Sequence, residues 1–155
     1  MLLQNKLFYV FILIGVLGLT PICFAETSTD NTSIAEVKKE TKELLQALRV
    51  YTVEQREEAI RKTKTALDNL DKRIDSLQAR IDRNWEQMDS TARDKARSNL
   101  DALRKERTHA AEWYGSMKSS TSDAWEHMKK GFSKAYSELN DAWEKSAKEF
   151  NANKE

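Results

Sequence analysis

Apolar residues recur every seven positions through the middle of the chain. Ile60, Leu67, Ile74, Ile81 and Met88 form one row, and Thr63, Leu70, Leu77 and Asn84 follow its first four members at a spacing of three. The remaining positions are mostly charged. This is the a/d pattern of a coiled coil, in which a narrow apolar stripe packs against a partner helix. We expect one long helix here, in which Asn84 selects the register of the partner.

Few residues interrupt the helical pattern elsewhere. Pro21 is the only proline, and Gly115 and Gly131 are the only glycines after residue 25. Three polar clusters supply side chains that cap helix ends: Thr52 with Gln55, Thr91 with Asp94, and the run 119–123. With no alternating β-branched runs, strands are not expected. We therefore predict helices at about 34–50, 53–88, 92–118 and 122–150.

If the chain reverses direction between these helices, its other helices can pack against the a/d stripe of the long helix. A turn near residue 90 places Leu100 beside Ile81 and Leu103 beside Leu77, because short connections favour antiparallel neighbours. A turn near residue 121 similarly brings Phe132 to Ala110, Leu139 to Leu103 and Phe150 to Ala92. The predicted fold is all-α, an antiparallel helical hairpin extended to a three- to four-helix bundle with coiled-coil character. A long hairpin that completes its core as a homodimer is the alternative. The predicted packing seam comprises Ile60, Leu67, Leu70, Ile74, Leu77, Ile81, Met88, Leu100 and Leu103.

The last predicted helix carries an aromatic stripe. At about 100° per residue, Trp125, Phe132, Tyr136 and Trp143 fall on one face. Such a stripe is either the core-facing side of a bundle or a surface for lipid or a protein partner. Most lysines lie at the centre of the opposite face rather than at its edges, where they would reach lipid headgroups. This placement favours core packing.

The first 25 residues have the pattern of a secretory signal peptide. Lys6 precedes an apolar run over residues 7–19, and Cys23 and Ala25 are the small residues before a predicted cleavage point. Cleavage after Ala25 would export the chain, into the periplasm of a bacterial host. The alternatives are an inner-membrane anchor formed by residues 7–24, which is short for a bilayer, and lipidation at Cys23. The chain then divides into a flexible leader at 26–33, a helical domain at 34–150 and a disordered tail at 151–155.

Charge and cysteine content narrow the function classes. Lys6 is the only charged residue among the first 25, so the rest of the chain carries 25 basic and 25 acidic residues. This balance argues against nucleic acid as a partner, because a nucleic-acid binder presents a basic patch. Cleavage would also remove Cys23, the only cysteine, and with it any thiol chemistry.

No pattern of catalytic or metal-binding residues emerges. Glu106 and His109 match one Glu-x-x-His unit of a di-iron bundle, but such sites use the motif twice, and the only other histidine, His127, follows Ala124 at that spacing. No glycine-rich phosphate loop or exposed nucleophile turn is present. We predict no catalytic residue, no metal, no cofactor and no small-molecule substrate.

Four segments carry a resemblance to a known family: 51–59 (YTVEQREEA), 67–82 (LDNLDKRIDSLQARID), 112–132 (EWYGSMKSSTSDAWEHMKKGF) and 135–145 (AYSELNDAWEK). They resemble small bacterial stress-response proteins whose coiled coil is similar to the amphipathic repeats of apolipoproteins. The resemblance covers about residues 50–147 and implies a stress role without an assigned reaction. We therefore expect a non-enzymatic, exported helical bundle, a structural or chaperone-like factor acting on protein partners or by self-association. The alternative is a protein that binds a lipid or envelope surface.

Overall fold

The computed structural model describes residues 34–152, which form four long helices and no strand. Helix α1 spans Ile34–Val50, α2 spans Arg56–Asn84, α3 spans Ser90–Lys118 and α4 spans Trp125–Ala152. Short 3₁₀ turns, η1 at Val53–Gln55 and η2 at Trp85–Gln87, flank α2. The described chain is therefore an all-α helical bundle, as the sequence predicts. The predicted signal peptide, the leader up to residue 33 and the end of the tail lie outside the described residues.

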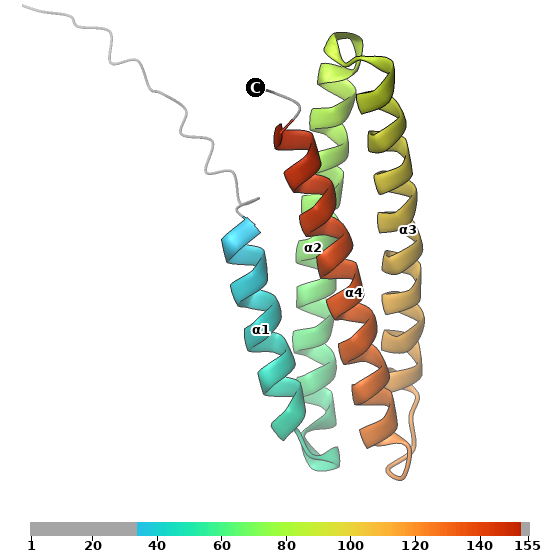
Figure 1. Ribbon diagram of the computed structural model, residues 1–155. Helices are drawn as coiled ribbons and strands as arrows, with labels where there is room; N and C mark the ends of the chain where they lie inside the picture. The colour runs from blue at the N-terminus through green and yellow to red at the C-terminus, as the bar shows by residue number, and fades with distance from the viewer. Residues whose placement is uncertain (1–33, 153–155) are drawn as a thin grey trace, which may run out of the picture.

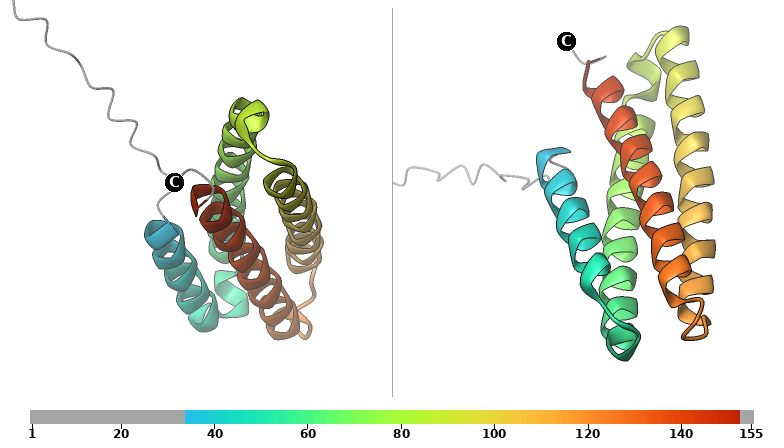
Figure 2. Two further views of the ribbon diagram at one scale, coloured as in Figure 1. Left: turned by 45° about the horizontal axis from the view of Figure 1, so that its top comes forward. Right: turned by 60° about the horizontal axis from the view of Figure 1, so that its bottom comes forward.

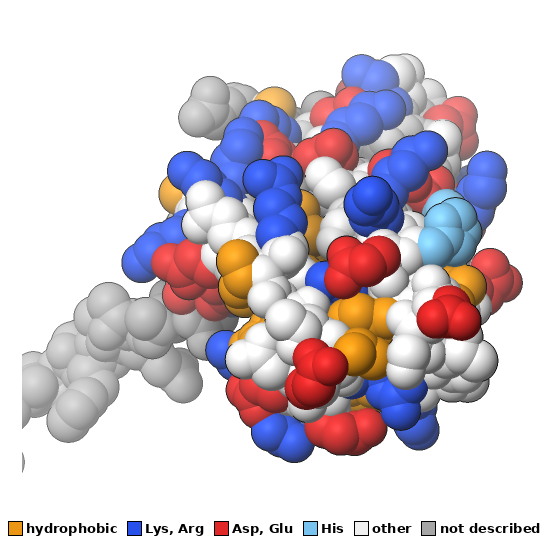
Figure 3. Space-filling model, turned by 90° about the horizontal axis from the view of Figure 1, so that it is seen from below, with side chains coloured by type: hydrophobic (Ala, Val, Ile, Leu, Met, Phe, Trp, Pro, Cys, Tyr) orange, Lys and Arg blue, Asp and Glu red, His pale blue; other side chains and the backbone are white. Residues whose placement is uncertain are grey.

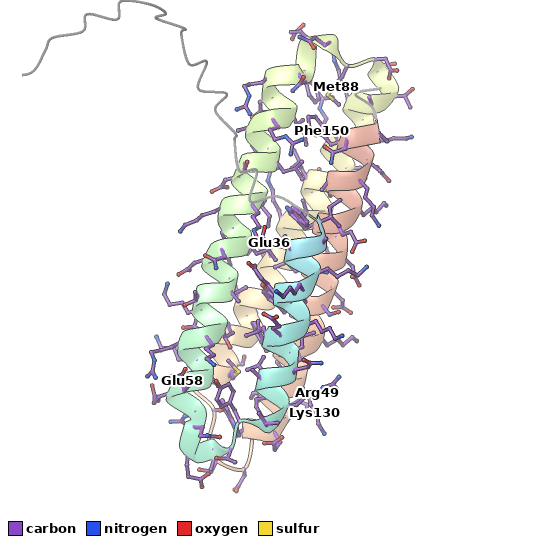
Figure 4. The ribbon with its side chains drawn as sticks, turned by 90° about the vertical axis from the view of Figure 1, so that its left-hand side faces the viewer. Glu36, Arg49, Glu58, Met88, Lys130 and Phe150 are labelled. Carbon is purple, nitrogen blue, oxygen red and sulfur yellow. The ribbon has the colours of Figure 1, made fainter. Side chains whose placement is uncertain are left out.

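The four helices run alternately down and up (Figure 1). Helix α3 packs most extensively against α4, while α1 packs against α4 and α2 on the other side of the bundle (Figures 1 and 2). Because α1 has 17 residues and α2 has 29, α1 covers only part of the groove between α2 and α4. Figure 4 shows α1 in front of α2 and α4, running alongside their lower parts. The buried residues of the described helices form one core within a single chain. The homodimer of the alternative stays a prediction.

The helix boundaries depend on local caps. Before η1, the Gln55 side chain accepts a hydrogen bond from the Thr52 amide at 3.3 Å, as the predicted capping box requires. The prediction of Thr91 as the cap of α3 is wrong, because Asp89 accepts from the Ala92 amide at 2.8 Å and its extended backbone starts the helix there. Helix α4 begins at Trp125, three residues later than predicted.

Most of the predicted seam lies in the core. Eight of its nine members are at most 8 % exposed, and they are Ile60, Leu67, Leu70, Ile74, Leu77, Ile81, Leu100 and Leu103. Met88 is the exception: it follows η2 in extended backbone and is only partly buried (Figure 4). The Asn84 amide donates to the Arg80 carbonyl of its own helix at 2.7 Å, and its role in register stays a prediction. The heptad pattern therefore ends one turn earlier than the sequence suggests.

The close approach of α3 and α4 depends on Gly131. A Cβ atom at this position would lie 2.2 Å from the six-membered ring of Trp113. At Gly115, by contrast, a Cβ would meet no atom within 4 Å. Of the two glycines, only Gly131 is required by packing.

We expect Gly131→Ala to destabilise the bundle by about 1 kcal/mol, because the cost of displacing the indole exceeds the gain in helix propensity. Gly115→Ala, the matched control, should instead stabilise it by about 0.5 kcal/mol, reduced from the usual gain by its place in the last turn of α3. Denaturant unfolding of both variants checks this contrast. Equal shifts in the unfolding free energy would show that the indole does not need the space at Gly131.

The outer surface is a mosaic of opposite charges. Seen from below, basic and acidic side chains are interspersed around a small hydrophobic area (Figure 3). Within residues 34–152, Val50 is the one large hydrophobic residue classed as exposed, at 74 %. Nearly all large apolar side chains in this part of the chain are thus at least partly buried.

Candidate functional site

The aromatic stripe of α4 faces inward. Trp125 and Trp143 are each 1 % exposed, Phe132 is fully buried, and Tyr136 is 4 % exposed. Phe132 and Tyr136 stack with their ring centroids 5.6 Å apart. In the closed bundle, therefore, these four side chains form part of the core and are not accessible to lipid or to a partner.

The lower end of the bundle is tied together through the carbonyl of Tyr51, just after α1. This oxygen accepts hydrogen bonds from Lys129 Nζ at 2.5 Å and from the Trp125 indole at 3.3 Å. The Lys129 ammonium is buried, but Glu126 lies 2.8 Å away and compensates its charge. Because Arg56 also donates to the Ser120 carbonyl at 2.7 Å, both lower loops are fixed to neighbouring helices.

A polar layer joins α1 to α4 and α2 higher up. Thr41 donates to the Asn140 side chain at 3.0 Å, and both residues are buried. Nearby, the Tyr136 hydroxyl donates to the Ala66 carbonyl at 3.3 Å, and burial raises the pKa of Tyr136 to about 12. The phenol therefore stays neutral at physiological pH. The Thr41 bond therefore attaches α1 to α4, and the Tyr136 bond joins α4 to α2 beside it.

Ion pairs at the edges of α1 add less to its attachment. Glu40 pairs with Arg73 of α2 at 3.1 Å, and Lys38 lies 3.5 Å from Glu144 of α4. Apart from these polar bonds, α1 is held by three buried apolar side chains, Val37, Leu44 and Leu48. Since a helix of 17 residues is marginal on its own in water, α1 depends on these contacts to remain folded.

Trp143 has an unusual position in the core. Its indole nitrogen is buried and has no hydrogen-bond acceptor among the described residues. A buried donor without an acceptor costs roughly 1–3 kcal/mol of stability. Trp143 therefore contributes apolar packing to the core while its polar edge remains unsatisfied.

An open groove of about 640 Å³ runs between the upper parts of α2 and α3. Trp85 lies in it, half-buried, with the guanidinium groups of Arg97 and Arg93 4.7 and 5.5 Å from its ring centroid. These are cation–π distances, so the Trp85 ring packs against the two arginines. Asp82, Glu86 and Asp101 also line the groove, which therefore has no single sign of charge.

A second open groove, of about 610 Å³, contains a cluster of metal-ligand side chains. Glu106 and His109 of α3 and Glu138 of α4 each offer one ligand atom, and the three atoms lie within 4.8 Å of one another. His109 Nδ1 is 3.8 Å from a carboxylate oxygen of each glutamate. All three residues are half-buried. The helix spacing alone predicted no metal here, but packing of α4 onto α3 supplies the third side chain.

Trp113 fixes the orientation of His109. Its indole N–H donates to His109 Nε2 at 3.0 Å, and its ring contacts the edge of His127 with centroids 5.8 Å apart. Because Nε2 accepts this bond, the neutral imidazole carries its proton on Nδ1, the nitrogen that faces the two carboxylates. Trp113 rests in turn over Gly131, so the arrangement depends on the tight α3–α4 contact.

Sequence reasoning missed Glu138 as a member of this cluster. The Glu106-x-x-His109 spacing was visible as one face of a helix, but Glu138 is one of many glutamates spaced along the chain. The predicted register, with Phe132 beside Ala110, places Glu138 opposite Arg104 instead, about five residues from His109. It therefore did not identify Glu138 as the third residue of the cluster.

Comparisons with known proteins add no relative. No protein-family model, no curated protein and no solved structure matches the chain. The resemblance to stress-response proteins therefore stays a prediction. Among the described helices, none is long and apolar enough to cross a membrane.

Proposed function

We propose that this chain is a non-enzymatic helical-bundle protein that acts by contact with other proteins, as a stress-related structural or chaperone-like factor. Its aromatic stripe is buried under a charged surface, and this observation carries the proposal. Because the stripe is buried, it can bind apolar segments of another protein only after the bundle opens and exposes it. We therefore propose that opening controls the contact.

Helix α1 is the element whose release supports this proposal best. It is the shortest of the four helices, and it packs less extensively on the bundle than α3 packs on α4. Its departure would uncover Asn140 and Tyr136 on α4 and break the Thr41 hydrogen bond. Elements of low local stability are the ones from which such movable parts are drawn.

The location of the protein belongs to the same proposal. The N-terminal pattern of Lys6, an apolar run and Ala25 supports export to a bacterial periplasm. Binding to a lipid or envelope surface is the second candidate, favoured by the tryptophans of the α4 stripe, Trp125 and Trp143. It too requires the bundle to open, since these residues are buried.

A crosslink across α1 tests the need for opening. Residues 26–155 contain no cysteine, so Thr41→Cys with Asn140→Cys gives two unique thiols where two side chains are in hydrogen-bond contact. Joining them with a short bifunctional thiol reagent should lower the suppression of aggregation of a thermally unfolded client several-fold. The same double variant without the reagent serves as its reference. Light scattering of the client measures the effect.

The matched control is a crosslink that leaves α1 free. Asn99 donates to Glu149 at 2.6 Å, so Asn99→Cys with Glu149→Cys ties α3 to α4 in the same way. This second crosslink should leave suppression unchanged. Equal loss with both crosslinks, or none with either, contradicts release of α1. If the reference protein suppresses no aggregation but binds anionic vesicles with a blue shift of tryptophan fluorescence, the lipid alternative replaces the first proposal.

A further inference from the structure

We propose that Glu106, His109 and Glu138 bind one divalent transition-metal ion, with Zn²⁺ as the representative. This inference is independent of the proposed function. It rests on the convergence of two carboxylates and one imidazole from two helices. Such a set suits a borderline cation, because imidazole favours Zn²⁺, Ni²⁺ or Cu²⁺ over Mg²⁺ or Ca²⁺, and two carboxylates balance its charge.

The distances fit a small closure around an ion. A tetrahedral Zn²⁺ with bonds of about 2.1 Å holds its ligand atoms about 3.4 Å apart. His109 Nδ1 is 3.8 Å from an oxygen of each glutamate, and all three ligand atoms lie within 4.8 Å of one another, so closure around the ion requires shifts of about 1 Å or less in the side chains. The groove is open, which leaves coordination positions for water.

The backbone beneath the site limits its freedom. Two ligands lie one turn apart on α3, and the third projects from α4, the helix against which α3 packs most extensively. Before an ion binds, Trp113 lies over Gly131 and holds the imidazole from its other side. An ion at this site would therefore connect α3 to α4 and stabilise the closed pair, since it binds only the folded arrangement.

Metal binding has a local consequence at Trp113. An ion on Nδ1 displaces the proton from that nitrogen, so the neutral imidazole must carry its proton on Nε2. The Nε2 proton would then face the indole N–H of Trp113, two donors 3.0 Å apart in the metal-free geometry. The indole must therefore shift when the ion binds. Tryptophan fluorescence reports this shift.

Competing charges also surround the site. Lys134 Nζ lies 3.8 Å from the other carboxylate oxygen of Glu138. The lysine is largely exposed, so an ion can displace it at low cost. Replacing Lys134 by glutamine should tighten Zn²⁺ binding, because one repelling cation is removed.

Titration of tag-free residues 26–155 with ZnCl₂ against a chromophoric chelator tests the proposal. We expect one ion per chain, a higher thermal midpoint and a change in tryptophan fluorescence, with no response to MgCl₂. His109→Gln and Glu138→Gln should each weaken binding at least tenfold, the size found for groups that only support a ligand. Trp113→Phe should retain binding, with at least wild-type affinity, but lose most of the fluorescence change.

Two nearby substitutions serve as controls. His127→Gln changes the other histidine, and Glu112→Gln changes a groove carboxylate outside the cluster. Both should bind Zn²⁺ as the unmodified chain does. Circular dichroism of each variant establishes that its helices are intact. Unchanged affinity in folded His109→Gln or Glu138→Gln, or no binding by the unmodified chain, would overturn the site.

Discussion

Replacing Phe132 by alanine is expected to lower the unfolding free energy by about 3–5 kcal/mol, the usual cost of removing a buried aromatic ring from a core. The ring is fully buried, lies between α4 and the other helices, and stacks on Tyr136. Its removal leaves a cavity that rigid neighbouring helices cannot fill, and it also removes the aromatic pair. Chemical denaturation followed by circular dichroism measures the loss.

Val50→Ala is the control for this prediction. Val50 is 74 % exposed at the end of α1, so its truncation should change the unfolding free energy by less than about 0.5 kcal/mol. If Phe132 instead served mainly as a lipid contact on an open helix, its truncation would leave lipid-free stability unchanged. A loss below about 1 kcal/mol would thus contradict its place in the core.

Trp125→Phe and Trp143→Phe are expected to differ in effect although both tryptophans are 1 % exposed. Trp125→Phe removes the hydrogen bond to the Tyr51 carbonyl and some ring volume, at a cost of about 1–2 kcal/mol. The cost stays in this range because Lys129 still donates to the same carbonyl. Trp143→Phe removes ring volume too, but it also removes a donor that has no acceptor among the described residues.

For Trp143→Phe the two changes oppose each other. The lost packing costs roughly 1 kcal/mol, and relief of the unsatisfied donor returns about 1–3 kcal/mol. The result should be neutral or stabilising. The urea midpoints of the two variants, compared at equal m-values, show which substitution lowers stability more. A larger loss at Trp143 than at Trp125 would mean that the Trp143 indole has an acceptor after all.

The sequence predicted the helices well where the pattern was strong. Ile60 to Ile81 alternate at three and four residues among charged positions, and a helix with this pattern has one face to bury. The predicted turn positions also follow from local chemistry, because cap residues act on amides only two or three positions away. The local rules gave the wrong residue at two helix ends. Asp89, and not Thr91, caps the start of α3, and η2 ends the helical run before Met88.

The candidate site could not be predicted in the same way. Glu106 and His109 share a helix face and are visible from spacing alone, but Glu138 is separated from His109 by a loop and much of α4. To predict that Glu138 lies beside His109, the register of α4 on α3 must be known to within one helical turn. That register depends on the fit of Trp113 over Gly131, a contact between side chain and backbone that no periodicity reveals.

By itself, the sequence determined the all-α class, the inward-facing stripes of α2 and α4, and the balance of basic and acidic residues. These properties follow from periodicity and composition, which act over a few turns or over the whole chain. The tertiary structure alone decided that α1 packs against both α2 and α4, that the buried Trp143 donor has no acceptor within residues 34–152, and that Glu138 joins His109. The reason is physical: these features depend on how specific side chains fit between helices far apart in sequence, to within a fraction of a helical turn.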